Sequence, residues 1–133
     1  MQKQPLYKFV MLIDEDDIDN IINQKIIESN NFSEKIQVHQ TGGEALDYLR
    51  KHEKTPDSLP DLIFLDINMP IMDGFQFLEE VEKRGTAVLD KCKIIMLSSS
   101  ISPRDIDRAA SNRFVKKYLN KPLNSRYLQA ITI

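Results

Sequence analysis

The sequence predicts an α/β fold, a doubly wound parallel sheet of five strands that alternate with five helices. Short apolar runs alternate along the chain with longer segments of helical periodicity, and strands that alternate with helices form parallel sheets through right-handed crossovers. Three of the runs, at residues 9–13, 62–65 and 94–97, are continuously apolar. A strand that is apolar on both sides needs cover on both faces, which is typical of a parallel sheet.

The five expected strands are the apolar runs themselves. They are FVMLI at residues 9–13, IQV at 36–38, LIFL at 62–65, IIML at 94–97 and a weaker run at 114–119. The first helix is expected where four isoleucines recur at helical spacing, namely Ile18, Ile21, Ile22 and Ile26. The second begins at Thr41, which precedes Glu44 by the three residues of a capping box.

Three further helices complete the alternation. One is expected from Gly74 to about Leu89, because apolar residues recur on one stripe of this segment. Another begins with Ser102 as its cap and Pro103 at its first position. The last is expected over residues 123–131.

Composition narrows the classes of protein to which the chain could belong. Its 133 residues favour one domain, and 18 basic against 20 acidic residues give a net charge of -2, which argues against a nucleic-acid-binding stripe. Cys92 is the only cysteine, so we expect a small buried hydrophobe and no internal disulfide. No apolar run approaches the ~20 residues that span a bilayer, and the N-terminus lacks the apolar core of a signal peptide. We expect a cytoplasmic protein with neither nucleic acid nor membrane as a partner.

The expected strands end on polar residues of complementary chemistry. An acidic run from Asp14 follows the first strand, and Asp66 follows the third. The fourth ends in serines from Ser98 onward, and the fifth ends near Lys121. Each residue alone is an ordinary loop or capping residue. The carboxyl ends of parallel strands meet at one edge, where such folds place their working site, so we expect these groups to converge.

Clustered carboxylates at that edge favour a cation. Two carboxylates about 4 Å apart repel by ~1 kcal/mol in water and ~4 kcal/mol at an effective dielectric of 20. A cluster of Asp14, Glu15 and Asp66 therefore raises its own pKa values or recruits a cation. Mg²⁺ suits this role because it prefers one or two carboxylates, waters and phosphate oxygens, and the backbone carbonyl of Asn68 offers another oxygen.

The same edge holds groups suited to a phosphoryl group. Lys121 can reach a phosphoryl oxygen as a point charge, and the Ser98 hydroxyl can donate to another. Asp66 is then a plausible nucleophile, since a carboxylate can form an aspartyl-phosphate. Asp17 and Asp19, further along the acidic run, are expected to be helix-start acids favoured by the helix dipole.

These motifs, in this order, resemble the receiver domain of two-component response regulators from about residue 7 to residue 128. The motifs are LIDED after the first strand, LDINMPIMDG around the third, MLSSS after the fourth and NKPL after the fifth. The pattern is most similar to stand-alone receivers. The resemblance implies a flavodoxin-like strand order 2-1-3-4-5 and a single receiver domain over residues 1–133, with a core from about residue 7 to residue 131.

Carried over position by position, the resemblance implies a magnesium site. Asp66 matches the phospho-accepting aspartate, and Asp14 and Glu15 match the acidic pair, with Glu15 in direct contact with Mg²⁺. The backbone carbonyl of Asn68 completes the metal site. The family usually has Asp where this chain has Glu15, so Asp16 remains an alternative direct ligand.

The resemblance also implies a switch. Lys121 matches the family's lysine, in a Lys121–Pro122 bond expected to be cis, while Ser98 matches the switch hydroxyl and Tyr118 the switch aromatic. After phosphorylation, Ser98 would move toward the new oxygens and Tyr118 would rotate inward. This changes the surface at residues 102–131, formed by the expected fourth helix, fifth strand and fifth helix, where a downstream protein is expected to bind.

The implied function is signalling rather than turnover of a substrate. Asp66 takes a phosphoryl group from a histidine kinase or phosphotransfer protein in a magnesium-dependent step, and self-catalysed phosphotransfer and dephosphorylation are the only expected reactions. One alternative is a magnesium-dependent phosphatase or nuclease, which is less favoured because no segment is expected to cap a substrate pocket. The other is a pseudo-receiver without phosphorylation, against which the full set of Asp66, Lys121 and Ser98 argues.

Overall fold

The computed structural model describes residues 4–131 and contains the expected five-stranded parallel sheet. The strands are β1 (Tyr7–Ile13), β2 (Ser33–His39), β3 (Leu62–Leu65), β4 (Lys93–Ser98) and β5 (Val115–Asn120). Their order is β2-β1-β3-β4-β5, and every neighbouring pair is parallel. The predicted fold class and strand order are confirmed.

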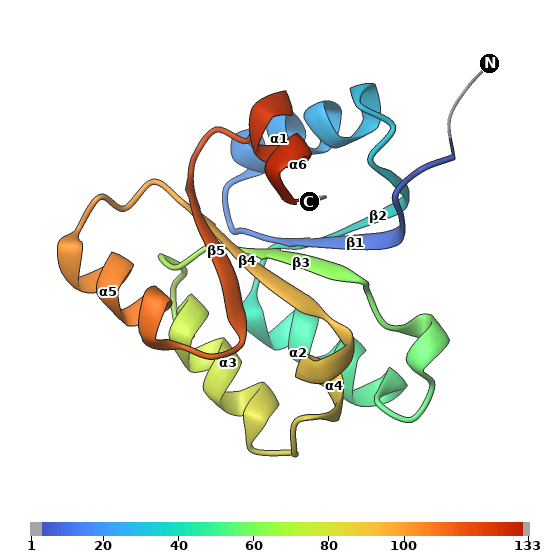
Figure 1. Ribbon diagram of the computed structural model, residues 1–133. Coiled ribbons are helices and arrows are strands. Elements are labelled where there is room, and N and C mark those ends of the chain that lie inside the picture. Colours follow the sequence, from blue (N-terminus) through green and yellow to red (C-terminus); the bar gives the residue numbers. More distant parts are fainter. Residues whose placement is uncertain (1–3, 132–133) are drawn as a thin grey trace.

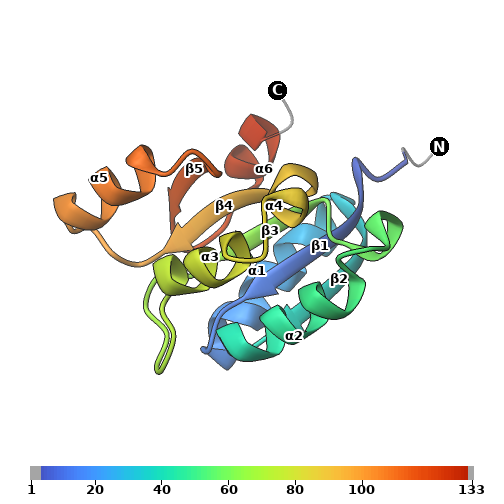
Figure 2. The ribbon, with the colours of Figure 1, turned by 90° about the horizontal axis from the view of Figure 1, so that it is seen from below.

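Helices cover both faces of the sheet (Figure 1). They are α1 (Asp17–Ser29), α2 (Gly42–His52), α3 (Gly74–Glu82), α4 (Ala87–Lys91), α5 (Pro103–Ser111) and α6 (Ser125–Ile131), with a 3₁₀ turn at Pro56–Ser58. α1 and α6 lie on one face, and α2 to α5 lie on the other (Figures 1 and 2). None of the helices within residues 4–131 is long and apolar enough to cross a membrane.

The alternation of side chains along the strands produces two cores. In β1, Phe9, Met11 and Ile13 pack toward α2 to α5, whereas Val10 and Leu12 pack toward α1 and α6. Successive side chains of a strand point to opposite faces, so a continuously apolar run supplies both cores at once. The expectation that these runs are buried on both sides is therefore confirmed.

One predicted helix is divided in two. The segment expected to be helical from Gly74 to about Leu89 contains α3 and the five-residue α4, so the described part of the chain forms six α-helices where five were expected. The break lies at Gly85, whose φ of 100° belongs to the left-handed region, where glycine ends helices without steric cost.

The first helix buries only part of the isoleucine stripe that predicted it, because Ile26 packs against the core while the other members are exposed. Ile18 is 68% exposed and Ile21 is 53% exposed, while Asn20 and Asn23 are buried. The asparagines face inward because backbone groups there need partners: Asn20 Nδ2 donates to the Asp14 carbonyl at 2.8 Å, and Asn23 Oδ1 accepts from Leu123 N at 3.3 Å. These bonds fix α1 against the ends of β1 and β5.

Close backbone packing holds the loop between β3 and α3. A Cβ added at Gly74 would lie 2.5 Å from the carbonyl oxygen of Asp66 and 3.1 Å from Cα of Ile67. Gly74 N also donates to the Ile67 carbonyl at 2.9 Å. The glycine thus lets helix α3 begin directly against the residue that follows β3.

We predict that Gly74→Ala destabilises the protein, because backbone atoms cannot move aside as a flexible side chain can. Urea unfolding should show a loss of about 1–3 kcal/mol, the usual range for overpacking. Gly43→Ala in α2 is the matched control, since its nearest neighbour, Thr41 Oγ1, is 3.9 Å from the added Cβ. The control should be neutral or gain up to about 1 kcal/mol; equal losses in both variants would contradict the packing argument.

Candidate functional site

The carboxyl ends of the strands converge at one edge, as expected. Asp14 follows β1, Asp66 follows β3 and Lys121 follows β5. Asp66 N donates to the Ile13 carbonyl at 3.0 Å, and Lys121 N donates to the Ser98 carbonyl at 3.0 Å. Each polar residue is therefore held by a backbone hydrogen bond to the end of a neighbouring strand.

The Lys121 ammonium is the centre of this edge. Its Nζ lies 2.6 Å from Asp14 Oδ2, 2.8 Å from Asp19 Oδ2 and 3.5 Å from Asp66 Oδ2. Asp14 and Asp66 are only 4% and 5% exposed. Three of the residues proposed from sequence are thus brought together, and Asp19, expected only to begin a helix, joins them.

Asp66 is the least satisfied carboxylate of the group. Its Oδ1 is buried and has no hydrogen-bond partner within residues 4–131. Burial, followed by repulsion from Asp14, raises the pKa of Asp66 to about 6, against the opposing effect of Lys121. A buried oxygen without a donor and a raised pKa mark a carboxylate that still lacks a partner.

The surroundings of Lys121 stabilise its charged, protonated form. Burial alone lowers the pKa of an ammonium, but the hydrogen bonds to Asp14 and Asp19 and the charge of Asp66 outweigh burial and raise the pKa of Lys121 above its usual value. One ammonium therefore faces three carboxylates. The imbalance leaves this edge able to accept a further cation.

The serines at the end of β4 and in the loop that follows it adjoin this group through the backbone, since the Ser98 carbonyl accepts from Lys121 N. Ser98 is fully buried at the end of β4, and its Oγ accepts from Ser100 N at 3.2 Å. No hydrogen bond joins its hydroxyl to Asp66 in the described part of the chain. The Tyr118 hydroxyl donates to the Ser100 carbonyl at 2.6 Å, and Ser100 Oγ donates to Asp105 at 2.7 Å. These bonds connect the loop after β4 to both β5 and α5.

The remaining proposed ligands differ in exposure and in hydrogen bonding from the buried carboxylates. Glu15 is exposed, and so is Asn68. Asp16 is the N-cap of α1, where its Oδ1 accepts from Ile18 N and Asp19 N at 2.9 and 3.0 Å. Across residues 4–131, no three His, Cys, Asp or Glu side chains are grouped closely enough to hold a metal ion by themselves.

The chemistry of the edge nevertheless fits Mg²⁺. The candidate metal ligands at this edge are oxygen atoms, which this ion prefers. Mg²⁺ usually takes only one or two carboxylates and completes its coordination shell with water. The unpartnered Oδ1 of Asp66 and the excess of carboxylates over ammonium groups both favour a cation. The Lys121–Pro122 peptide bond is cis, as expected.

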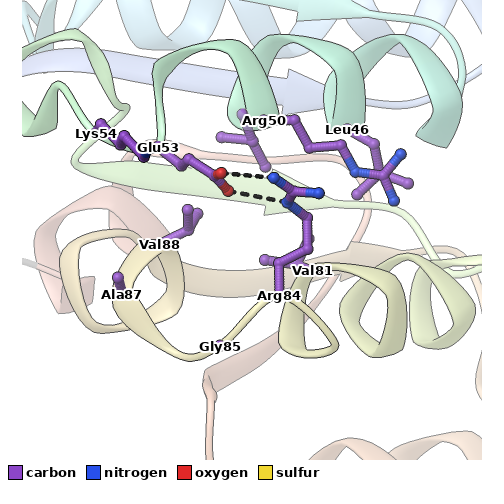
Figure 3. A pocket seen from close by; sticks show the side chains of 10 residues that line it. Leu46, Arg50, Glu53, Lys54, Val81, Arg84, Gly85, Ala87 and Val88 are labelled. Carbon is purple, nitrogen blue, oxygen red and sulfur yellow. Dashed lines mark hydrogen bonds and ion pairs between the residues drawn. The ribbon is translucent and has the colours of Figure 1, made fainter.

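An apolar pocket lies elsewhere, between α2 and the α3–α4 segment (Figure 3). It has a volume of about 200 Å³ and is lined by side chains that include Leu46, Leu49 and Val88. Arg84 crosses it to Glu53 through two hydrogen bonds of 3.0 and 2.6 Å. None of the residues that line it belongs to the carboxylate group, so it plays no part in the chemistry of that edge.

We predict that Asp66→Asn stabilises the metal-free protein at neutral pH. Because folding raises the pKa of Asp66 from 3.8 to about 6, the folded state holds this proton more tightly, and stability falls as pH rises through that interval. In buffer with a chelator at pH 7.5, the variant should gain about 1–3 kcal/mol, and the gain should disappear near pH 4. Urea unfolding across this pH range measures it.

Asp61→Asn is the control for this prediction, because the pKa of Asp61 is shifted in the opposite direction. The hydrogen bond from Lys91 and two backbone N–H groups outweigh the burial of Asp61 and lower its pKa. Its replacement should therefore destabilise the protein at pH 7.5. A gain for Asp61→Asn, or no gain for Asp66→Asn, would contradict the electrostatic reading of the site.

Comparisons with known proteins agree with this architecture. The family model of the response regulator receiver domain matches residues 10–132. The probable methanogenesis regulatory protein FilR2 of Methanothrix harundinacea is 32% identical over 115 residues, which are 86% of this chain and 72% of that protein. A two component response regulator from Cytophaga hutchinsonii has a TM-score of 0.88 and 31% identity, over 97% of this chain and 95% of that one. The Mn²⁺-bound form of response regulator Rcp1 has a TM-score of 0.69 and 24% identity, over 94% and 88%. The chain therefore belongs to the response regulator receiver domain family of two-component signalling.

Proposed function

We propose that this receiver domain is phosphorylated on Asp66 in a magnesium-dependent step and that the modification changes its contacts with other proteins. One observation carries the proposal: a buried carboxylate with an unpartnered oxygen lies 3.5 Å from a lysine ammonium at the carboxyl edge of the sheet. The phosphoryl group comes from a histidine kinase or a phosphotransfer protein, the partners with which receiver domains pair.

The residues that would hold Mg²⁺ are Asp14, Glu15, Asp66 and the backbone carbonyl of Asn68. Glu15 is favoured over Asp16 as the direct carboxylate ligand, because the Asp16 carboxylate already caps α1 through two hydrogen bonds. Rcp1, a response regulator of related fold, has been solved in a Mn²⁺-bound form, which supports the binding of a divalent ion. When bound, Mg²⁺ supplies positive charge to the equatorial oxygens of the transferring phosphoryl group.

The chain's own residues do the rest of the chemistry. An oxygen of the ionised Asp66 carboxylate attacks the phosphorus of the donor phosphohistidine, so that an O–P bond forms while the P–N bond breaks and imidazole leaves with the electron pair. The N–H groups of the Lys121 ammonium donate hydrogen bonds to the incoming phosphoryl oxygens. Rigid placement at the end of β3 keeps Asp66 aligned for this attack. The product is an acyl phosphate, which water later hydrolyses.

The switch surface is formed by α5, β5 and α6. In the described state, Tyr118 is held by its bond to the Ser100 carbonyl, and Ser100 is held to Asp105 of α5. Movement of Ser98 toward a phosphoryl group would pull the following loop and break this set of bonds. The result is a shift in population between two arrangements of the surface that a downstream protein contacts. A cytoplasmic location is consistent with these partners.

We predict that acetyl phosphate with Mg²⁺ adds one phosphoryl group to the protein, as measured by intact-mass spectrometry. Asp66→Ala should abolish the addition, since no other buried carboxylate within residues 4–131 has an unpartnered oxygen. Asp57→Asn is the control, because this exposed residue lies in the 3₁₀ turn before β3, and it should be phosphorylated like wild type. Turnover of acetyl phosphate without a modified protein would favour an enzyme, and no reaction in any variant would favour a pseudo-receiver.

A further inference from the structure

We propose that Asp19 is a positioning residue that holds the Lys121 ammonium on the α1 side of the site and so opposes its movement to a phosphoryl group on Asp66. This inference rests on the proposed function. It gives Asp19, which belongs to none of the expected motifs, a role in setting how easily the site accepts its modification.

The distances show where the ammonium is held. Lys121 Nζ is 2.8 Å from Asp19 Oδ2, a direct hydrogen bond, but 3.5 Å from Asp66 Oδ2. The two shortest contacts of the ammonium therefore go to Asp14 and Asp19, and the proposed phosphoacceptor lies at the longest of the three distances. In this state the lysine is drawn away from the atom at which the reaction would occur.

The position of Asp19 is fixed by the way α1 is anchored. Asp19 N donates to the capping carboxylate of Asp16 at 3.0 Å. One residue later, Asn20 Nδ2 donates to the Asp14 carbonyl, and Asn23 accepts from the backbone of Leu123, just beyond Lys121. Because α1 is tied to both sides of the site, the Asp19 carboxylate cannot simply follow the lysine if the lysine moves.

The attraction between Asp19 and Lys121 does not compete with the proposed binding of a metal ion. Asp14 and Asp66 are proposed to share a bound cation, which reduces their hold on Lys121. Asp19 is not among those ligands, so its attraction for the ammonium persists. Its side chain is 34% exposed and that of Lys121 is 10% exposed, so solvent weakens this attraction but does not remove it.

It follows that the lysine must exchange Asp19 for phosphoryl oxygens when the site is occupied. Removal of the Asp19 charge lowers the free-energy cost of that exchange and leaves the amide oxygen to accept a weaker hydrogen bond. Asp19→Asn should therefore bind a phosphoryl analogue more tightly than wild type. Asp19→Glu keeps the charge and should return the affinity toward the wild-type value.

The test measures beryllofluoride binding by calorimetry at saturating Mg²⁺. Asp19→Asn should bind about three- to tenfold more tightly than wild type, the effect of roughly one partly screened charge. Asp17→Asn is the matched control, because Asp17 also lies in the first turn of α1 but pairs with Gln40 rather than with Lys121. It removes the same charge and the same contribution to the helix dipole, and its affinity should stay near that of wild type.

Three results would overturn the inference. The first is unchanged or weaker binding by Asp19→Asn while wild type binds normally. The second is an equal gain for Asp17→Asn, which would mean that net charge alone is responsible. The third is an Asp19→Glu variant that behaves like Asp19→Asn. If wild type itself binds no beryllofluoride, the proposed function fails and the inference fails with it, so the two failures are distinguishable.

Discussion

The structure depends on the compensation of buried carboxylates by one ammonium. Without Lys121, Asp14 and Asp66 would be two like charges, almost wholly buried, at neighbouring strand ends, an arrangement that costs several kcal/mol per uncompensated ion. With it, three carboxylates share a single positive charge, at 2.6, 2.8 and 3.5 Å. The site is thus stable enough to fold yet remains deficient in positive charge. That deficiency links the fold to the proposed binding of a cation.

The parallel sheet makes this compensation possible. Asp14 and Lys121 are more than a hundred residues apart in the chain, and only convergence of the strand ends brings them together. The backbone bonds from Asp66 to Ile13 and from Lys121 to Ser98 continue the sheet by one step beyond its last paired residues. Anchoring of α1 by Asn20 and Asn23 then closes the site from the side. Rigid placement of this kind is what a transfer reaction without a dedicated substrate pocket requires.

Much of this arrangement could be predicted from the sequence because it follows from short-range patterns. Continuous apolar runs identified β1, β3 and β4, and the polar residues directly after them located Asp14, Asp66 and Ser98 at one edge. Other features depend on contacts that spacing does not reveal. The contact of Asp19 with Lys121 joins residues 102 positions apart, and Ile18 and Ile21 are exposed because α1 buries asparagines that satisfy backbone groups. Gly85, with its positive φ, divides a predicted helix whose apolar stripe is continuous in the sequence.

The most direct test of the account is a crystal structure of the protein with Mg²⁺ and beryllofluoride. Beryllium should be bonded to an oxygen of Asp66, with the Lys121 ammonium in contact with a fluoride rather than with Asp19 and the Ser98 hydroxyl turned toward the same group. Beryllofluoride bound to a different side chain, or an Asp66 carboxylate left unmodified while Lys121 keeps its bonds to Asp14 and Asp19, would contradict it.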